Sequence, residues 1–301
     1  MTGRTVTNSL AALTLAVGLT LPLGHIWAAE LKVGKPTQTE KTEPLWELGL
    51  GAAGLYLPHY PAAAQNQTRF LPFPFLIYRG EIFRSDEKGY LRGRIFKSER
   101  VELDLSFSGS LPVDSEDNDA RSGMEELDWL AEIGPRLQIN LLKTGDPSRN
   151  AKIDFELPIR GVFSTDFSEA PDYRGIKFAP AVVYENENVG DSSVNFKVSA
   201  AAIFATEGLM DYFYEVDAQF VRSDRPEYDA DAGYLGARFG FNMKRKFWSR
   251  VTGFLNTNLW NFSGSTNSGS PLSLETFNYG VVAGFKLTLF QSDERVREKG
   301  F

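Results

Sequence analysis

Apolar and polar residues alternate along most of this chain, and this pattern restricts its possible folds more than any other feature. The alternation is clear over Val101–Phe107, Leu137–Leu141, Ile153–Ile159 and Leu235–Met243. Successive side chains of a β-strand point to opposite faces, so a period of two is the signature of a strand with two different faces. No sustained period of 3.6 residues accompanies it. The sequence therefore predicts an all-β fold.

The alternating segments are long for a soluble protein, whose strands usually have about 3–10 residues. A tilted strand that crosses a membrane needs about 9–11 residues and can extend beyond the bilayer. About ten strands are predicted, at 46–57, 70–84, 100–112, 127–143, 151–165, 174–187, 194–206, 232–245, 247–262 and 275–290.

The predicted connections differ in length. The short ones are Thr144–Asn150, Asn186–Ser193 and Lys244–Lys246. The longer, polar ones are Pro58–Arg69, Pro112–Glu126, Glu207–Asp231 and Ser263–Leu274, with the shorter 166–173 among them. Short periplasmic turns opposite longer outer loops are typical of outer-membrane barrels. We expect both mature termini in the periplasm.

Segment 85–99 leaves the strand count open. Tyr90–Phe96 could form one more strand, but a single extra strand would move the acidic loop 112–126 to the periplasmic side. We therefore interpret 85–99 as a periplasmic connection with some local strand. The prediction is a closed transmembrane antiparallel barrel of about ten strands, with twelve as the alternative.

Composition excludes several other classes. The chain of 301 residues has no Cys and two His, which rules out disulfide scaffolds and thiolate zinc sites. Its net charge of -7 argues against nucleic acid as a partner. A soluble sandwich or an eight-stranded lipid-binding barrel remains an alternative. Charges of both signs lie on the polar face of the predicted strands, as Glu102, Asp104, Asp154 and Arg160 illustrate. They suit the interior of a narrow membrane barrel better than the solvated surface of a soluble fold.

The N-terminus is predicted to be a secretory signal over residues 1–28, with cleavage near Ala28 and Ala29. Arg4 supplies the positive charge, and an apolar stretch over 10–19 follows it. Residues 29–44 are predicted to be a polar periplasmic lead-in, 45–290 the barrel, and 291–301 a periplasmic tail. This address and the strand pattern together predict the outer membrane of a Gram-negative bacterium.

The last predicted strand resembles the C-terminal insertion signal that the barrel assembly machinery reads. Gly284 is followed by Leu287, Leu289 and the aromatic Phe290. The tail after Phe290 departs from the usual layout, in which the aromatic residue ends the chain. Gly284, Leu287, Leu289 and Phe290 are therefore the candidate insertion residues, and outer-membrane lipids and lipopolysaccharide are expected around the barrel.

Several longer stretches resemble the MipA/OmpV family of outer-membrane proteins, the MltA-interacting protein family. They are Leu55–Pro61, Leu71–Gly80, Asp117–Met124, Glu132–Leu137, Asp211–Val216, Tyr228–Tyr234 and Ser270–Leu272. The chain departs from the family pattern at Glu215 and Glu125, where the family usually has Gly and a small residue or Pro. The resemblance implies an outer-membrane scaffold that anchors a murein lytic transglycosylase and a murein synthase.

Two other functions are weighed against the scaffold. A narrow channel or solute-uptake protein is the main alternative, although about ten strands enclose little space. An outer-membrane enzyme is the least favoured, because His59 is the one histidine of the mature chain and lies in a Pro-flanked loop. Glu125 and Glu126 are interpreted as solvated charges. No catalytic, cofactor-binding or metal-binding residue is predicted, and no cofactor is expected.

Overall fold

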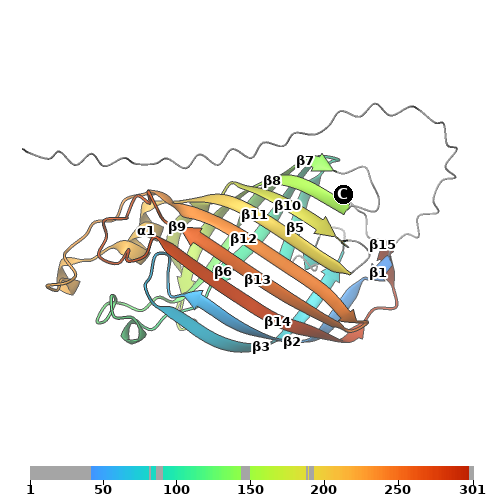
Figure 1. The fold of residues 1–301 in the computed structure, drawn as a ribbon, viewed down its shortest axis with the longest axis horizontal. Coiled ribbons are helices and arrows are strands. Elements are labelled where there is room, and N and C mark those ends of the chain that lie inside the picture. Colours follow the sequence, from blue (N-terminus) through green and yellow to red (C-terminus); the bar gives the residue numbers. More distant parts are fainter. Residues whose placement is uncertain are drawn as a thin grey trace, which may run out of the picture. The chain divides into compact units, whose positions relative to one another are not determined.

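The computed structural model describes residues 42–80, 83–85, 91–143, 150–187, 189 and 193–297. Thirteen strands form one antiparallel sheet that closes on itself (Figure 1). They are β2 (Trp46–Pro58), β3 (Asn66–Arg79), β4 (Phe83–Ser85), β5 (Leu91–Lys97), β6 (Val101–Ser110), β7 (Trp129–Lys143), β8 (Asn150–Thr165), β9 (Asp172–Phe178), β10 (Ala181–Glu187), β11 (Val194–Ala205), β12 (Gly233–Trp248), β13 (Val251–Asn261) and β14 (Phe277–Gln291). The predicted signal at 1–28 and most of the predicted lead-in lie outside the described residues.

The thirteen strands occupy twelve rows around the barrel, because β9 and β10 share one. Both pair with β8 on one side and with β11 on the other. Pro180, which has no N–H to donate, lies at the break between them. The predicted all-β antiparallel barrel is confirmed, and its count is that of the twelve-strand alternative rather than of ten.

The two additional rows are β4, which begins within the end of the predicted strand 70–84, and β5, which lies in segment 85–99, where a periplasmic connection with some local strand was expected. β4 pairs with β3 through Tyr78 and Arg79, and β5 pairs with β6 from Arg92 to Lys97. Because a hairpin adds two strands, the direction of every later strand is unchanged. The loop at 112–126 therefore lies at the same end of the barrel as the other long loops, as expected; which side of the membrane this end faces stays a prediction.

The turn predicted at Lys244–Lys246 is wrong. These residues belong to β12, which continues to Trp248 and pairs there with β13, for example Lys244 with Phe254. Three consecutive charged residues are typical of a turn. At the end of a barrel strand, however, such side chains can reach water while the backbone hydrogen bonds to the next strand continue. The turn lies instead at residues 249–250.

The two ends of the barrel differ. One end, called here the short-turn end, carries the connections at 98–100 and 249–250 and a two-stranded ribbon of β1 (Thr42–Pro44) and β15 (Arg295–Arg297). The other, the long-loop end, carries loops 59–65, 111–128, 166–171, 206–232 and 262–276. These loops contain helix α1 (Glu207–Tyr214) and the 3-10 turns η1 (Ser115–Asp117) and η3 (Ala218–Phe220). The turn predicted at 144–150 falls largely outside the described residues.

Strand β3 has an edge with no neighbouring strand among the described residues beyond Tyr78 and Arg79. The N–H of Arg79 donates to Leu45, on the β2 side, and Tyr78 faces β4. Bonding directions alternate along an antiparallel strand, so Pro72 and Pro74 share the parity of Tyr78 and point to the open side. The two residues that lack an N–H therefore lie on the side where the described residues provide no ladder partner for them.

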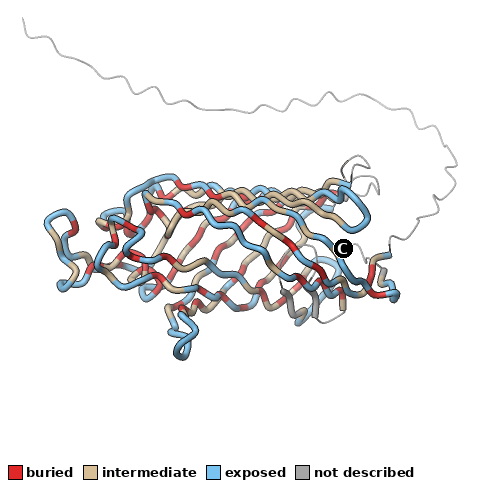
Figure 2. The backbone as a smooth tube through the Cα atoms, turned by 90° about the horizontal axis from the view of Figure 1, so that it is seen from below, coloured by how far each residue is buried: buried red, intermediate tan, exposed pale blue. Residues whose placement is uncertain are grey.

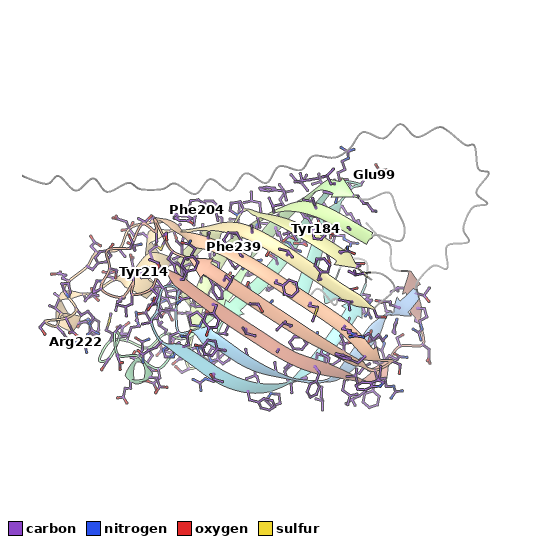
Figure 3. All side chains as sticks on the ribbon, in the orientation of Figure 1. Glu99, Tyr184, Phe204, Tyr214, Arg222 and Phe239 are labelled. Atoms are coloured by element: carbon purple, nitrogen blue, oxygen red, sulfur yellow. The ribbon has the colours of Figure 1, made fainter. Side chains whose placement is uncertain are left out.

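The outer wall is apolar over its whole middle section. Large apolar side chains are exposed there, including Leu48, Leu50, Leu76, Ile133, Val198, Phe239, Leu259 and Phe285. Figure 3 shows Tyr184, Phe204 and Phe239 on the outside of the wall. Monomeric soluble proteins rarely expose a continuous apolar surface of this extent. The described residues contain no helix long and apolar enough to cross a membrane.

Aromatic side chains concentrate near both ends of the wall. Trp46, Tyr78, Trp248 and Phe290 are exposed near the short-turn end, and Trp129, Tyr173, Phe277 and Tyr279 are exposed near the long-loop end. Buried and exposed residues alternate along the strands between them (Figure 2). An apolar band between two aromatic girdles around a polar interior is the construction of an outer-membrane barrel.

Strand β14 closes the barrel against β2, the first strand of the wall. Gly284 permits this contact, because a Cβ there would lie 2.2 Å from the carbonyl oxygen of Ala52. Leu287 and Leu289 face outward with exposures of 40% and 39%. A bulge after Thr288 also turns Phe290 outward, with an exposure of 61%. Their role as an insertion signal stays a prediction.

A capped lumen as the candidate functional site

The long-loop end of the barrel is filled by an apolar cluster, called here the cap. Inward-facing residues from the strand ends supply part of it: Leu130, Val162, Ile203, Ala205 and Leu235. The loops supply Tyr60, Ala62, Ala63, Val113, Leu127, Leu209, Met210, Phe213, Tyr214, Val216, Ala230, Phe262 and Leu272, and Ala179, between β9 and β10, completes the cluster. Met210, Tyr214 and Leu272 have no exposed surface. Loops that in an open pore would surround an opening here pack against one another and against the inner wall.

Two buried tyrosines join the cap loops through their hydroxyls. Tyr60 donates to the carbonyl of Leu272 at 2.9 Å, and Tyr214 donates to the carbonyl of Pro61 at 3.0 Å. The hydroxyl of Ser270 in turn donates to the carbonyl of Tyr214 at 2.7 Å. Burial raises the pKa of Tyr60 to about 12 and that of Tyr214 still further, so both hydroxyls remain donors at neutral pH.

Two arginines connect loop 111–128 with loop 206–232. Arg121 is 4% exposed and donates to the carbonyls of Phe213 and Glu125. Arg225 is 3% exposed and donates to the carbonyls of Ala120, Ser122 and Phe220. Burial lowers the pKa of both guanidinium groups, and both donate to backbone oxygens of the cap loops, which need hydrogen bonds when they are buried.

Helix α1 brings several acids together on the cap. The pKa of Asp211 is raised to about 6, first by burial and then by the nearby charges of Glu215, Glu207 and Asp229. The helix was not predicted, because eight residues are too few to establish a helical period. Its buried Leu209, Met210, Phe213 and Tyr214 nevertheless follow helical spacing, so a signal was present.

Below the cap, ion pairs join neighbouring strands across the inner wall. Arg136 of β7 contacts Asp104 of β6 at 2.5 Å and Glu156 of β8 at 3.5 Å. Glu156 also pairs with Lys197 of β11 at 3.3 Å. Asp104 is 1% exposed and Arg136 is 5% exposed, so the central pair is removed from water. A buried charge of this kind depends on its partner.

Two further groups of ion pairs extend this network in both directions. Glu132 accepts from Lys177 and lies 3.6 Å from Arg160, toward the cap. Lys152 lies 3.0 Å from Asp154 and 3.2 Å from Glu185, toward the short-turn end. The prediction that charges of both signs line the interior is thus met by side chains from five neighbouring rows.

On the adjacent strands β12 and β13, amides line the inner face beside Arg238, whose Nε is buried. Asn258 donates to Asn256 at 2.7 Å, and Asn256 donates to Asn242 on the neighbouring strand. A Cβ at Gly240 would lie 2.7 Å from the hydroxyl of Ser199, so this wall is closely packed as well. The inner face at β6–β11, called here the charged wall, is therefore continued at β12–β13 by amides and Arg238.

The structure also locates the residues that were weighed as chemical candidates. His59 lies in a cap loop, where its Nδ1 and the Nδ2 of Asn118 are 2.9 Å apart, and burial lowers its pKa. Glu125 and Glu126 are exposed on the cap, as interpreted from the sequence. The described residues contain no group of three His, Cys, Asp or Glu side chains that could hold a metal ion.

Five of the stretches that carry the family resemblance contribute to the cap. They are Leu55–Pro61, Asp117–Met124, Asp211–Val216, Tyr228–Tyr234 and Ser270–Leu272. Although they are distant in the sequence, they meet around Tyr60, Arg121 and Tyr214. A family model described as "MltA-interacting protein MipA" matches residues 50–288, which is most of the chain and includes the whole cap. The chain belongs to the MltA-interacting protein MipA family.

The remaining comparisons add little to this assignment. No curated protein matches the chain. The NanC porin covers 80% of this chain with all of its own length, at 10% identity and a TM-score of 0.37. A bacterial polysaccharide outer-membrane secretin gives 82% and 98% coverage, 9% identity and a TM-score of 0.38. The P. putida toluene transporter TodX gives 83% and 68% coverage, 9% identity and a TM-score of 0.23. At these scores no argument is built on the three structures.

Proposed function

We propose that this chain is a non-conducting outer-membrane anchor that holds a murein lytic transglycosylase, with a murein synthase as a further partner. The family description, MltA-interacting protein, supports the transglycosylase as the partner. The observation that carries the proposal is the cap. A barrel whose long-loop end is packed with buried side chains is suited to a rigid support rather than to a solute path.

The proposed docking face is the short-turn end, which we place in the periplasm with both mature termini. Within the described part of the chain, the β1–β15 ribbon is the largest structural element there, and Arg79 fastens it to the barrel. The guanidinium of Arg79 donates to the carbonyl of Pro44 at 2.8 Å and lies within 2.9 Å of both Glu43 and Glu47. A partner bound to this ribbon would therefore be held in a fixed position relative to the wall.

Catalysis is not part of the proposal. His59, the one mature histidine, is in contact with Asn118 inside the cap. We expect His59→Ala to leave capture of the partner unchanged, because the side chain lies at the end of the barrel opposite the ribbon. If cells that carry this variant showed an envelope defect while the barrel folded and captured its partner normally, that result would argue for chemistry at this site.

The test measures capture and conductance on the same purified barrel. Purified lytic transglycosylase is passed over the immobilised protein, and planar bilayers record single-channel current. In the ribbon variant, Gly and Ser replace Thr42–Pro44 and Arg295–Arg297. The control variant is Arg222→Ala, at the tip of the cap (Figure 3).

We expect the unmodified barrel and the Arg222→Ala variant to capture the enzyme and the ribbon variant to lose it, with no steady current from any of them. Heat-modifiable migration on gels verifies that each barrel is folded. Steady conductance, together with capture that does not depend on the ribbon, would overturn the proposal in favour of the channel alternative.

A further inference from the structure

A cavity of about 290 Å³ opens at the short-turn end, against the inner face of the charged wall. Glu102 of β6, Gln138 and Asn140 of β7 and Asp154 of β8 form its floor, because all four project inward from adjacent strands. Residues of the turn at 98–100 and of the end of β7 form its rim. The site is thus built on strands, which hold side chains in position more firmly than loops do.

Asp154 fixes the orientation of the two amides in this floor. The Nε2 of Gln138 donates to one of its carboxylate oxygens at 2.9 Å, and the Nδ2 of Asn140 donates to the other at 2.8 Å. Asp154 is 1% exposed, so these bonds are shielded from water. Because both amide groups donate to Asp154, their carbonyl oxygens remain available as acceptors. Within the described residues, neither oxygen receives a hydrogen bond.

Glu102 adds a negative charge to these acceptors. Its side chain is 8% exposed, and its Oε1 accepts from the Nε of Arg94 at 3.3 Å. Its Oε2 is buried and has no hydrogen-bond partner in the described part of the chain. An unsatisfied buried acceptor is unfavourable, more so when it is charged, so a donor that reached it would stabilise the protein.

We propose that this cavity binds a primary ammonium group. An ammonium has three N–H donors and no acceptor, which matches the three oxygens offered by Glu102, Gln138 and Asn140. Arg100 and Lys143 at the rim are exposed, so solvent and salt screen their repulsion. The ammonium of Lys152 is paired with Asp154 and Glu185, which offset its charge, whereas Glu102 acts from a buried position. The inference does not depend on the proposed anchoring function, since the site is formed by the barrel alone.

The test is titration calorimetry on the full-length protein in detergent at low ionic strength. The probe is 1,5-diaminopentane, and pentane-1,5-diol is the uncharged counterpart of the same length. The variants are Glu102→Gln, which removes the charge, and Asn140→Ala, which removes one acceptor at the less buried edge. Glu116→Gln, an exposed acid at the long-loop end, controls for the change in net charge.

We expect saturable binding of the diamine and none of the diol. Binding should weaken at least tenfold in Glu102→Gln and severalfold in Asn140→Ala, and it should be unchanged in Glu116→Gln. Two further probes separate the sources of the ammonium group: Nα-acetyl-lysine amide and its Nε-acetylated form. Binding of the first alone assigns the site to lysine side chains as well as free amines, and binding of neither restricts it to free amines.

Three results would overturn the proposal. They are equal affinity for the diamine in Glu102→Gln and the unmodified protein, equal affinity for the diol, and no saturation at millimolar diamine. If Glu102→Gln does not fold, undiminished binding by Asn140→Ala has the same force, because the amide oxygen is one of the three proposed acceptors.

Discussion

The cap and the charged wall are both buried, but they are held together by different interactions. Apolar side chains fill the cap, and its buried hydroxyls and guanidinium groups bond to backbone carbonyls, as Tyr60 and Arg225 do. In the wall, charged side chains pair across neighbouring strands, as Arg136 and Asp104 do. Removing a cap side chain leaves a cavity, whereas removing a wall side chain leaves an unpaired charge. Only the second defect can be repaired by removing a second residue.

The largest expected effect is in the wall. Arg136→Met removes the bidentate ion pair of Asp104 in a buried position, and breaking a buried ion pair in this way costs about 3–5 kcal/mol. The double variant Arg136→Met, Asp104→Leu removes both charges of this ion pair. Most of the lost stability should therefore return. Urea unfolding in lipid vesicles measures both variants. Equal destabilisation of the single and the double variant would remove the distinction between the two regions.

Leu272→Ala is the corresponding change in the cap. The side chain has no exposed surface, and a buried Leu→Ala substitution costs about 2–5 kcal/mol, depending on how far the site collapses. We expect the loss to loosen the cap while the wall stays folded, which limited proteolysis of the loops would detect together with intermittent current in bilayers. Leu272→Met, which conserves volume, is the control. A global loss of barrel stability with resistant loops would contradict this.

Tyr60→Phe should have a smaller effect. It removes the hydrogen bond to the carbonyl of Leu272 and keeps the ring in place, so the expected cost is about 1 kcal/mol, measured as protease resistance of the cap. Tyr228→Phe is a matched comparison, because its hydroxyl bonds to Asn267 at 3.2 Å in a more exposed position. If Tyr228→Phe lowered the protease resistance of the cap more than Tyr60→Phe did, burial would not explain the contribution of the Tyr60 hydrogen bond to stability.

The smallest effect concerns pH. The pKa of Asp211 is 3.8 when unperturbed and about 6 in the folded cap, so the folded cap holds this proton more tightly. Ionisation between these values therefore destabilises the cap as pH rises, and the loss is complete above about pH 6. Amide exchange in α1, corrected for its intrinsic rate, should show more protection at pH 5 than at pH 7. Asp211→Asn should abolish the difference, and an unchanged difference would assign it to other groups.

Sequence reasoning succeeded for the wall because alternation records the inner and outer faces of each strand directly. It failed for β4, since three residues are too few to alternate. It also could not show which loops meet in the cap, because Tyr60 and Leu272 are joined only by the closure of the barrel. The pairing of Arg136 with Asp104 likewise depends on strand register, which the pattern of one strand does not contain. The residue types lining the wall were predicted, but their partners were not.

The two prolines in β3 have a consequence for how the chain behaves before and during insertion. An unpaired strand edge presents N–H and C=O groups that can template pairing with another chain, and this is a common start of aggregation. Along the side of β3 that faces no strand among the described residues, Pro72 and Pro74 remove two successive donors, so a strand from a second copy would find gaps in the ladder. These two prolines therefore protect this stretch of β3 against edge-to-edge association.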